Sequence, residues 1–388
     1  MAVTCAQTLR RACMFMFGRP VLRPNGFLSS LCFANTPPSR ITGVCKIAAV
    51  TSQRGEERGR KDGRRGRGRG IWTVPAAIFG LFGSSEEPSS KEEELIMLLK
   101  KAKLSMLRGE LEAASSFLHA AAAIAHGERH RPAIIYTYSQ MANLAYVQGH
   151  LTQQAEKLFK AAMSYMLAGG MPQDDNAFVE MSLKLATMYA QENKAELAEH
   201  GFRFCLETLE GKVQKFEETP ADQLTEADEV LRKDTRLLLG LCLDSHARYL
   251  ASKKQLTQAA AHYRKALDIC QKEQGPHHHQ TLVLMSDLAT ILDLQGRHDD
   301  ALALLRQAVD TGRVSGHEDL HVLLANMATV LLHAGRHDDG IRMFHEALDL
   351  AREVDDSNAI RHILRGLSRA AKTAQADSGR EEAEQPVT

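Results

Sequence analysis

The sequence has few aromatic residues, no long apolar run and none of the common nucleotide-binding or hydrolase motifs. Aromatic residues make up 5% of the 388 residues, with one tryptophan, which disfavours the aromatic-filled core of a β-sandwich. No stretch of 18 consecutive apolar residues occurs, so the sequence predicts no ordinary membrane-spanning helix. Neither G-x-x-x-x-G-K-[ST] nor G-x-S-x-G is present, so the usual signals of a phosphate-binding loop and a nucleophile elbow are missing.

Cysteine is too unevenly placed for a disulfide-based fold. Four of the seven cysteines lie within residues 1–70. The other three, Cys205, Cys242 and Cys270, lie inside helical patterns. We therefore expect them to be small buried hydrophobic residues and not partners in disulfides.

Acidic residues are absent from residues 1–55, which contain six arginines, one lysine and interspersed Ser and Thr. Residues 1–70 carry 14 basic and 3 acidic residues, while the remainder carries 34 basic and 45 acidic residues. The zero net charge is therefore the sum of a basic first part, +11, and an acidic second part, −11. Such an Arg-rich, acid-poor start is typical of a mitochondrial transit peptide. We expect residues 1–70 to be a transit peptide followed by an Arg/Gly-rich linker; a disordered basic tail is the alternative.

The linker and the segment after it suggest two kinds of partner. Residues 54–70, RGEERGRKDGRRGRGRG, could attract RNA phosphates, but no aromatic residues are interleaved with the charges, so we expect no nucleic acid. Residues 71–90 combine a 13-residue apolar segment, IWTVPAAIFGLFG, with a polar spacer. Because a span needs roughly 20 residues, this segment predicts peripheral contact with a membrane or docking on a partner.

Two later segments repeat each other. LATILDLQGRHDDALALLRQAVD, from Leu288, and MATVLLHAGRHDDGIRMFHEALD, from Met327, share Ala-Thr, Gly-Arg-His-Asp-Asp and a later Ala and Asp, at an offset of 39 residues. Each has a small residue in one helix, a turn residue seven later, Ala or Gly five after that, and Ala seven further on. Small residues at this spacing let two antiparallel helices approach closely, so the pattern predicts a repeated helical hairpin.

The same spacing occurs six times along the chain. The six sets are Ala102, Gly109, Ala114, Ala121; Ala142, Gly149, Gln154, Ala161; Ala186, Asn193, Ala198, Cys205; Ala247, Lys254, Ala259, Ala266; Ala289, Gly296, Ala301, Ala308; and Ala328, Gly335, Gly340, Ala347. The second set departs from the pattern at Gln154, with Ala155 one place late. Larger side chains are expected to fill the space to the next hairpin, namely Phe202, Tyr263, Leu305 and Phe344.

The predicted fold class is all-α, a tetratricopeptide-repeat α-solenoid of about six helical hairpins over residues 91–372. An acidic insertion at residues 211–233 is expected to be an extended helix end and a loop. Residues 358–372 are expected to form a C-terminal capping helix, and residues 373–388 a disordered tail.

Two phrases carry a more specific resemblance. GPHHHQTLVLMSDLATILDLQGRHDDAL and TYSQMANLAYVQGHLTQQAEKLFKAAMSYMLAGGMPQDDNA resemble the mitochondrial tetratricopeptide repeat protein 19 family over about residues 92–372. The resemblance implies a non-catalytic protein of the mitochondrial inner membrane that supports assembly and maintenance of respiratory complex III through its Rieske iron–sulfur subunit. Since no catalytic motif is assembled, we also predict no cofactor and no small-molecule substrate. Kinesin light chains share the longer repeat style, so an adaptor outside mitochondria, either kinesin-light-chain-like or RNA-associated, is the alternative.

Several histidines suggest chemistry without establishing it. Residues 317–321, HEDLH, match the H-E-x-x-H motif of zinc hydrolases, but Gly316 precedes them, so they open a helix and do not lie within one. Residues 277–279 are three histidines at a proline-containing turn, where a solvated loop is expected. His298 and His337 occupy equivalent turns of two repeats, which indicates packing positions. We therefore predict no catalytic residues and no metal site.

Function is expected on the groove lined by the first helices of successive hairpins. The expected partner-binding residues are Tyr136, Ser139, Asn143 and Tyr146, then Glu180, Leu183 and Thr187, then Asp244 and Arg248, and finally Val283, Ser286, Thr290 and Asp293. Each could equally be a packing position. Because Arg248 is the one basic residue among them, an acidic peptide tail is disfavoured as ligand. Tyr136 and Tyr146 are the first candidates, since tyrosine is enriched at binding hot spots.

Overall fold

The computed structural model describes residues 90–148, 152–220 and 225–383. Within these ranges the chain is α-helical with connecting turns and contains no strand. The predicted transit peptide, linker and apolar segment lie outside the described residues. None of the described helices is both long enough and apolar enough to cross a membrane.

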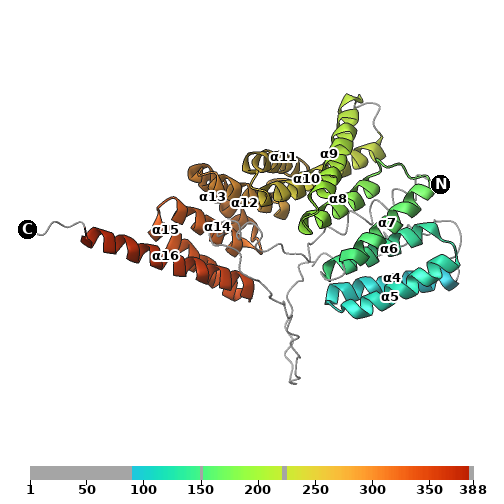
Figure 1. Cartoon of the computed structure of the whole chain (residues 1–388), viewed down its shortest axis with the longest axis horizontal. Helices are drawn as coiled ribbons and strands as arrows, with labels where there is room; N and C mark the ends of the chain where they lie inside the picture. Colours follow the sequence, from blue (N-terminus) through green and yellow to red (C-terminus); the bar gives the residue numbers. More distant parts are fainter. Residues whose placement is uncertain (1–89, 149–151, 221–224, 384–388) are drawn as a thin grey trace, which may run out of the picture.

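The described helices form six antiparallel hairpins and a final single helix, arranged as an arch (Figure 1). The hairpins are α4 (Ser90–Arg108) with α5 (Leu111–Gly127), α6 (Arg131–Val147) with α7 (Thr152–Ala168), α8 (Asn176–Gln191) with α9 (Ala195–Glu218), α10 (Glu226–Ser252) with α11 (Leu256–Gln274), α12 (His279–Leu294) with α13 (His298–Ser315), and α14 (Leu320–His333) with α15 (His337–Glu353). The last helix is α16 (Ser357–Ala383). The predicted solenoid of six hairpins with a capping helix is confirmed.

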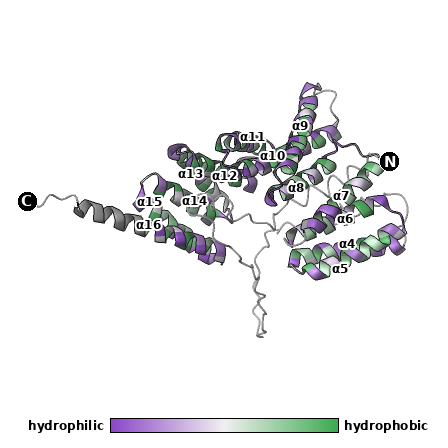
Figure 2. Cartoon of the chain, viewed as in Figure 1, coloured by the Kyte–Doolittle hydropathy of each residue, from purple (hydrophilic) through white to green (hydrophobic). Residues whose placement is uncertain are grey.

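Small residues bring the helices together as the spacing predicts. The first alanine of each set is 0–1% exposed, at positions Ala102, Ala142, Ala186, Ala247, Ala289 and Ala328. The larger residues Phe202, Tyr263, Leu305 and Phe344 are also fully buried. Figure 2 shows hydrophobic and hydrophilic residues along each helix, as expected for helices that bury one face against neighbours.

The turn position of each predicted set adopts a left-handed backbone wherever the structure describes it. Glycine takes this position in three hairpins, with φ of 75–77°. Asn193 and Lys254 occupy it in the other two, with φ of 58° and 61°. Side chains other than glycine rarely adopt this conformation. The spacing pattern therefore located the turns even where the residue type did not signal them.

Two boundaries differ from the prediction. In α7 the buried small residues are Ala155 and Ala162, while Gln154 is exposed, so the second helix of this hairpin is one residue out of the predicted register. A long polar glutamine does not fit a close helix crossing, whereas the adjacent alanine does. At the other end, α16 continues to Ala383, although a disordered tail was expected from residue 373. Ala, Gln, Arg and Glu make up most of residues 373–383 and are good helix formers.

Three of the first helices, α10, α12 and α14, lie on the inner side of the curve. The helix α8 contacts α10, α12 contacts α14, and α14 contacts α16. In these pairs the helices that open successive hairpins, or the final helix, are neighbours, and Figure 1 shows α10, α12 and α14 nearer the inside of the arch than α11, α13 and α15. Residues on these helices are positioned to form one continuous surface.

Candidate partner-binding surface

The residue directly after the buried alanine is half-buried in all six hairpins. On α4 it is Lys103, and on the next five first helices it is Asn143, Thr187, Arg248, Thr290 and Thr329; we call these last five the groove row. The three threonine hydroxyls each donate to the carbonyl oxygen four residues earlier, at 2.9–3.0 Å. This local bond satisfies each hydroxyl within its own helix. The groove row therefore consists of four uncharged polar side chains and one arginine along the inner helices.

Four members of the groove row were predicted from the sequence, and Thr329 was not. Thr329 lies one repeat offset after Thr290 in the aligned segments. The repeat alignment therefore contained the signal that would have included it.

Most of the other predicted groove residues are buried. Tyr136, Ser139, Glu180, Leu183, Asp244, Ser286 and Asp293 belong to the buried set, while Tyr146 and Val283 are half-buried. A buried side chain offers no area to a partner unless the helices separate. Their placement fits the alternative role as packing positions, and Tyr146 is the more accessible of the two tyrosine candidates.

Several of these polar residues connect one inner helix to the next. Gln191, the last residue of α8, donates from Nε2 to the Tyr146 hydroxyl in α6 at 2.9 Å. Asn326 in α14 donates to Ser286 in α12 at 2.8 Å. Burial raises the pKa of Tyr146, so its hydroxyl remains protonated. These bonds fix the spacing between successive repeats.

Arg248 is held between two carboxylates. Its Nε and a terminal nitrogen lie 3.1 and 2.7 Å from the two carboxylate oxygens of Asp244, and Asp287 on α12 lies 3.8 Å away. Burial raises the pKa of Asp287 to about 7; Arg248 opposes this shift, and Asp244 adds to it. The Arg248 charge is therefore compensated within the protein, which agrees with the expectation that acidic peptide tails are poor ligands here.

Asp293 forms a second bridge between repeats. Its two carboxylate oxygens accept hydrogen bonds from His298 Nδ1 at 2.8 Å and from His333 Nδ1 at 2.7 Å. The hydrogen bond to Asp293 raises the pKa of His333. Helices α12, α13 and α14 are thereby joined through one buried carboxylate. The sequence placed Asp293 in the groove and His298 at a packing position but did not show that they meet.

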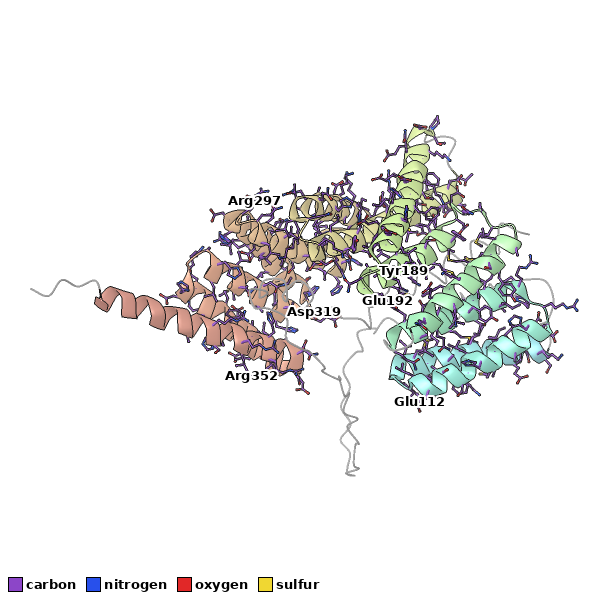
Figure 3. All side chains as sticks on the ribbon, viewed as in Figure 1. Glu112, Tyr189, Glu192, Arg297, Asp319 and Arg352 are labelled. Atoms are coloured by element: carbon purple, nitrogen blue, oxygen red, sulfur yellow. The ribbon has the colours of Figure 1, made fainter. Side chains whose placement is uncertain are left out.

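The H-E-x-x-H motif does not assemble into a hydrolase site. His317 precedes α14, which begins at Leu320. His321 is buried at 1% exposure, and its Nε2 lies 3.3 Å from Asp356 Oδ2. A zinc hydrolase needs both imidazoles on one face of one helix. Here His321 contacts Asp356, directly before α16. His317 instead lies close to His279 and Asp319, the last of which is labelled in Figure 3.

Comparison with known proteins agrees with this architecture. The family model of the tetratricopeptide repeat matches residues 241–312 and 319–379. Tetratricopeptide repeat protein 19, mitochondrial, from Rattus norvegicus is 46% identical over 319 residues, covering 80% of this chain and 84% of the relative. The chain belongs to the mitochondrial tetratricopeptide repeat protein 19 family. The Danio rerio relative of the same name is 58% identical over 249 residues, which cover 63% of this chain and 61% of that protein.

Membership of the tetratricopeptide repeat protein 19 family makes this chain a mitochondrial repeat protein. Its fold is also similar to a solved structure from Pyrococcus horikoshii, a signal transduction ATPase with a tetratricopeptide repeat sensor. The TM-score is 0.51 and the identity 14%, with 76% of this chain and 42% of that chain covered. This similarity supports the fold alone. Repeat family and fold together point to a protein-interaction scaffold.

Proposed function

We propose that this protein is a non-catalytic scaffold at the mitochondrial inner membrane that supports assembly and maintenance of respiratory complex III through its Rieske iron–sulfur subunit. Family membership carries the proposal: identity of 46% extends over 84% of the rat relative. The resemblance noted in the sequence implies a role in complex III assembly and maintenance for members of this family. Peripheral attachment to the inner membrane through residues 71–83 is part of this proposal.

The geometry of the inner helices supports binding more than chemistry. Among the described residues, the strongest polar clusters join one repeat to the next: Arg248 lies between Asp244 and Asp287, and Asp293 lies between two histidines. Because these charged groups pair with each other across repeats, they stabilise the solenoid. The groove row then offers mostly neutral polar side chains, which suit a folded or extended protein segment of low charge.

The test is rescue of cells that lack the protein. We expect such cells to retain mitochondrial translation and import and to lose ubiquinol–cytochrome c reductase activity. Reintroducing the chain should restore that activity, and Glu318→Gln should restore it equally. Because the glutamate of H-E-x-x-H is the general base of a zinc hydrolase, failure of Glu318→Gln at normal abundance would favour an enzyme.

Cell fractionation separates the proposal from an adaptor outside mitochondria. We expect the purified protein to begin downstream of the Arg-rich leader. Carbonate extraction of mitochondria should release it, because the apolar segment is shorter than the roughly 20 residues of a span. A protein retained wholly in the membrane pellet would contradict peripheral attachment, and an unprocessed cytosolic chain would favour the adaptor.

A further inference from the structure

Two imidazoles and a carboxylate meet where the fifth hairpin packs against the sixth. His279 is the first residue of α12, and His317 and Asp319 belong to the turn between α13 and α14. His279 Nδ1 lies 2.9 Å from His317 Nε2 and 4.0 Å from Asp319 Oδ2. All three donor groups lie within 4.8 Å of one another. We propose that these three residues bind a transition-metal ion of the Zn²⁺ type, with solvent completing the coordination.

The backbone around His317 is fixed by the end of α13. Gly316 adopts a left-handed conformation with φ of 64°, and the His317 N–H donates to the Gly312 carbonyl at 2.8 Å. The His317 carbonyl in turn accepts from the Leu320 N–H at 3.2 Å. This is the hydrogen-bond pattern of a helix C-cap. The position of His317 is therefore set by regular structure, which is what a preformed ligand requires.

Asp319 departs from the usual role of an aspartate at its position. It is the N-cap residue of α14, yet its carboxylate makes no capping hydrogen bond. The equivalent aspartates before α8 and α16, Asp175 and Asp356, both accept backbone N–H groups from their own helices at 2.9–3.1 Å. An N-cap aspartate normally stabilises its helix in this way. The Asp319 carboxylate instead lies toward the two imidazoles.

The ring geometry needs only a small adjustment to admit a metal. The His279 and His317 rings are within 6° of parallel, with centroids 4.8 Å apart and their nitrogens facing each other. Two imidazole nitrogens on one tetrahedral Zn²⁺ lie about 3.3 Å apart. All three side chains are half-buried, so an ion can enter from solvent.

One hydrogen bond must be exchanged on binding. The Asp319 N–H donates to His317 Nδ1 at 3.0 Å, so without metal the His317 proton lies on Nε2 and points at His279. Coordination through Nε2 moves that proton to Nδ1. The Asp319 N–H then loses its acceptor, and at the open start of α14 a water molecule can replace it. We therefore expect saturable binding of moderate affinity.

The experiment uses the full chain without a histidine tag. Titration with Zn²⁺ should show one saturable site, and Co²⁺ in its place should give the visible absorption of a coordinated ion. His279→Gln and His317→Gln should each weaken binding at least about tenfold. Asp319→Asn makes no capping contact to lose, so it should weaken binding without lowering the Tm of the metal-free protein. Zn²⁺ should raise the Tm of the unmodified chain and not that of His279→Gln.

The matched control is the double variant His277→Gln, His278→Gln. Both residues are exposed on the turn before His279. His278 also accepts the Gln280 N–H at 3.2 Å as the N-cap of α12, and the amide oxygen of Gln can accept the same bond. If the control binds Zn²⁺ as the unmodified chain does, the three-residue site is supported. If the control loses binding and His317→Gln retains it, the ion binds only to the exposed histidine run, and the proposal is overturned. Absence of saturable binding overturns it as well.

Discussion

Single residues in this protein act mainly by joining neighbouring repeats. Asp293, Arg248 and Tyr146 each bond to a residue on the next hairpin or the one before it. In a solenoid, each hairpin contacts only its neighbours, so stability depends on such interfaces. A change at one of these residues should therefore weaken the coupling between repeats more than the hairpin that carries it.

The bridge at Asp293 gives a pH-dependent prediction. Asp293→Asn removes the carboxylate that both His298 and His333 contact, and should lower the free energy of unfolding by about 1–2 kcal/mol, since both imidazoles are partly exposed and solvent screens the pair. The pKa of His333 is raised in the folded protein. That contribution is complete below the unfolded pKa and is lost as pH rises through the folded pKa.

Urea unfolding at about pH 6 and about pH 9 would measure the effect. The deficit of Asp293→Asn should be larger at the lower pH. The control is Asp300→Asn, which removes an exposed carboxylate paired with Arg297 and should change stability little at either pH. An equal deficit of Asp293→Asn at both pH values would mean that His333 does not titrate against Asp293.

At the scale of helices, the closest crossings decide which residues are tolerated. Ala301, near the start of α13, is fully buried, while Ala303, two residues later in the same helix, is exposed. Ala301→Asp forces a carboxylate into a dry helix crossing and should cost several kcal/mol, enough to unfold neighbouring hairpins. Ala303→Asp places the same group in water. Thermal unfolding should show a large loss for the first and little change for the second; equal Tm values would refute the assigned register.

Much of this helix arrangement could be predicted from the sequence. Spacing of small residues identified the six hairpins, their turns and the buried plugs such as Phe344. It did not identify Gly201, where an added Cβ would lie 2.6 Å from the Cβ of Ala186. That close approach depends on the crossing of α8 and α9, and it lies outside the four-position pattern. The register of α7 failed for a related reason, because Gln154 interrupts the pattern.

Contacts between repeats could not be predicted, and the candidate sites consist of such contacts. His279 and His317 each belong to a motif that is visible in the sequence, but they meet only because the fifth and sixth hairpins stack at a particular angle. The Asp293 bridge likewise joins α12, α13 and α14. Spacing along one chain determines which face of a helix is buried; it does not determine which side chains of adjacent repeats touch.

For the whole molecule, the groove row is the surface that the proposed function needs. Its members come one from each of five inner helices, so a long partner segment would contact several repeats at once. Thr187 and Thr290 lie on α8 and α12, on either side of the helix that carries Arg248. Arg248 occupies the equivalent position on α10, where Asp244 and Asp287 compensate its charge.

The double variant Thr187→Arg, Thr290→Arg should restore less complex III activity than the unmodified chain in cells that lack the protein. Two long cationic side chains would block a neutral partner segment by their bulk and would also repel a basic one. The control adds the same two charges to exposed positions of the outer helix α13, as Ala303→Arg and Val314→Arg. Activity should be compared at equal protein abundance and Tm. Full rescue by the groove variant would leave the scaffold proposal standing and place its partner surface elsewhere, while equal loss in both variants would indicate a general effect of added charge.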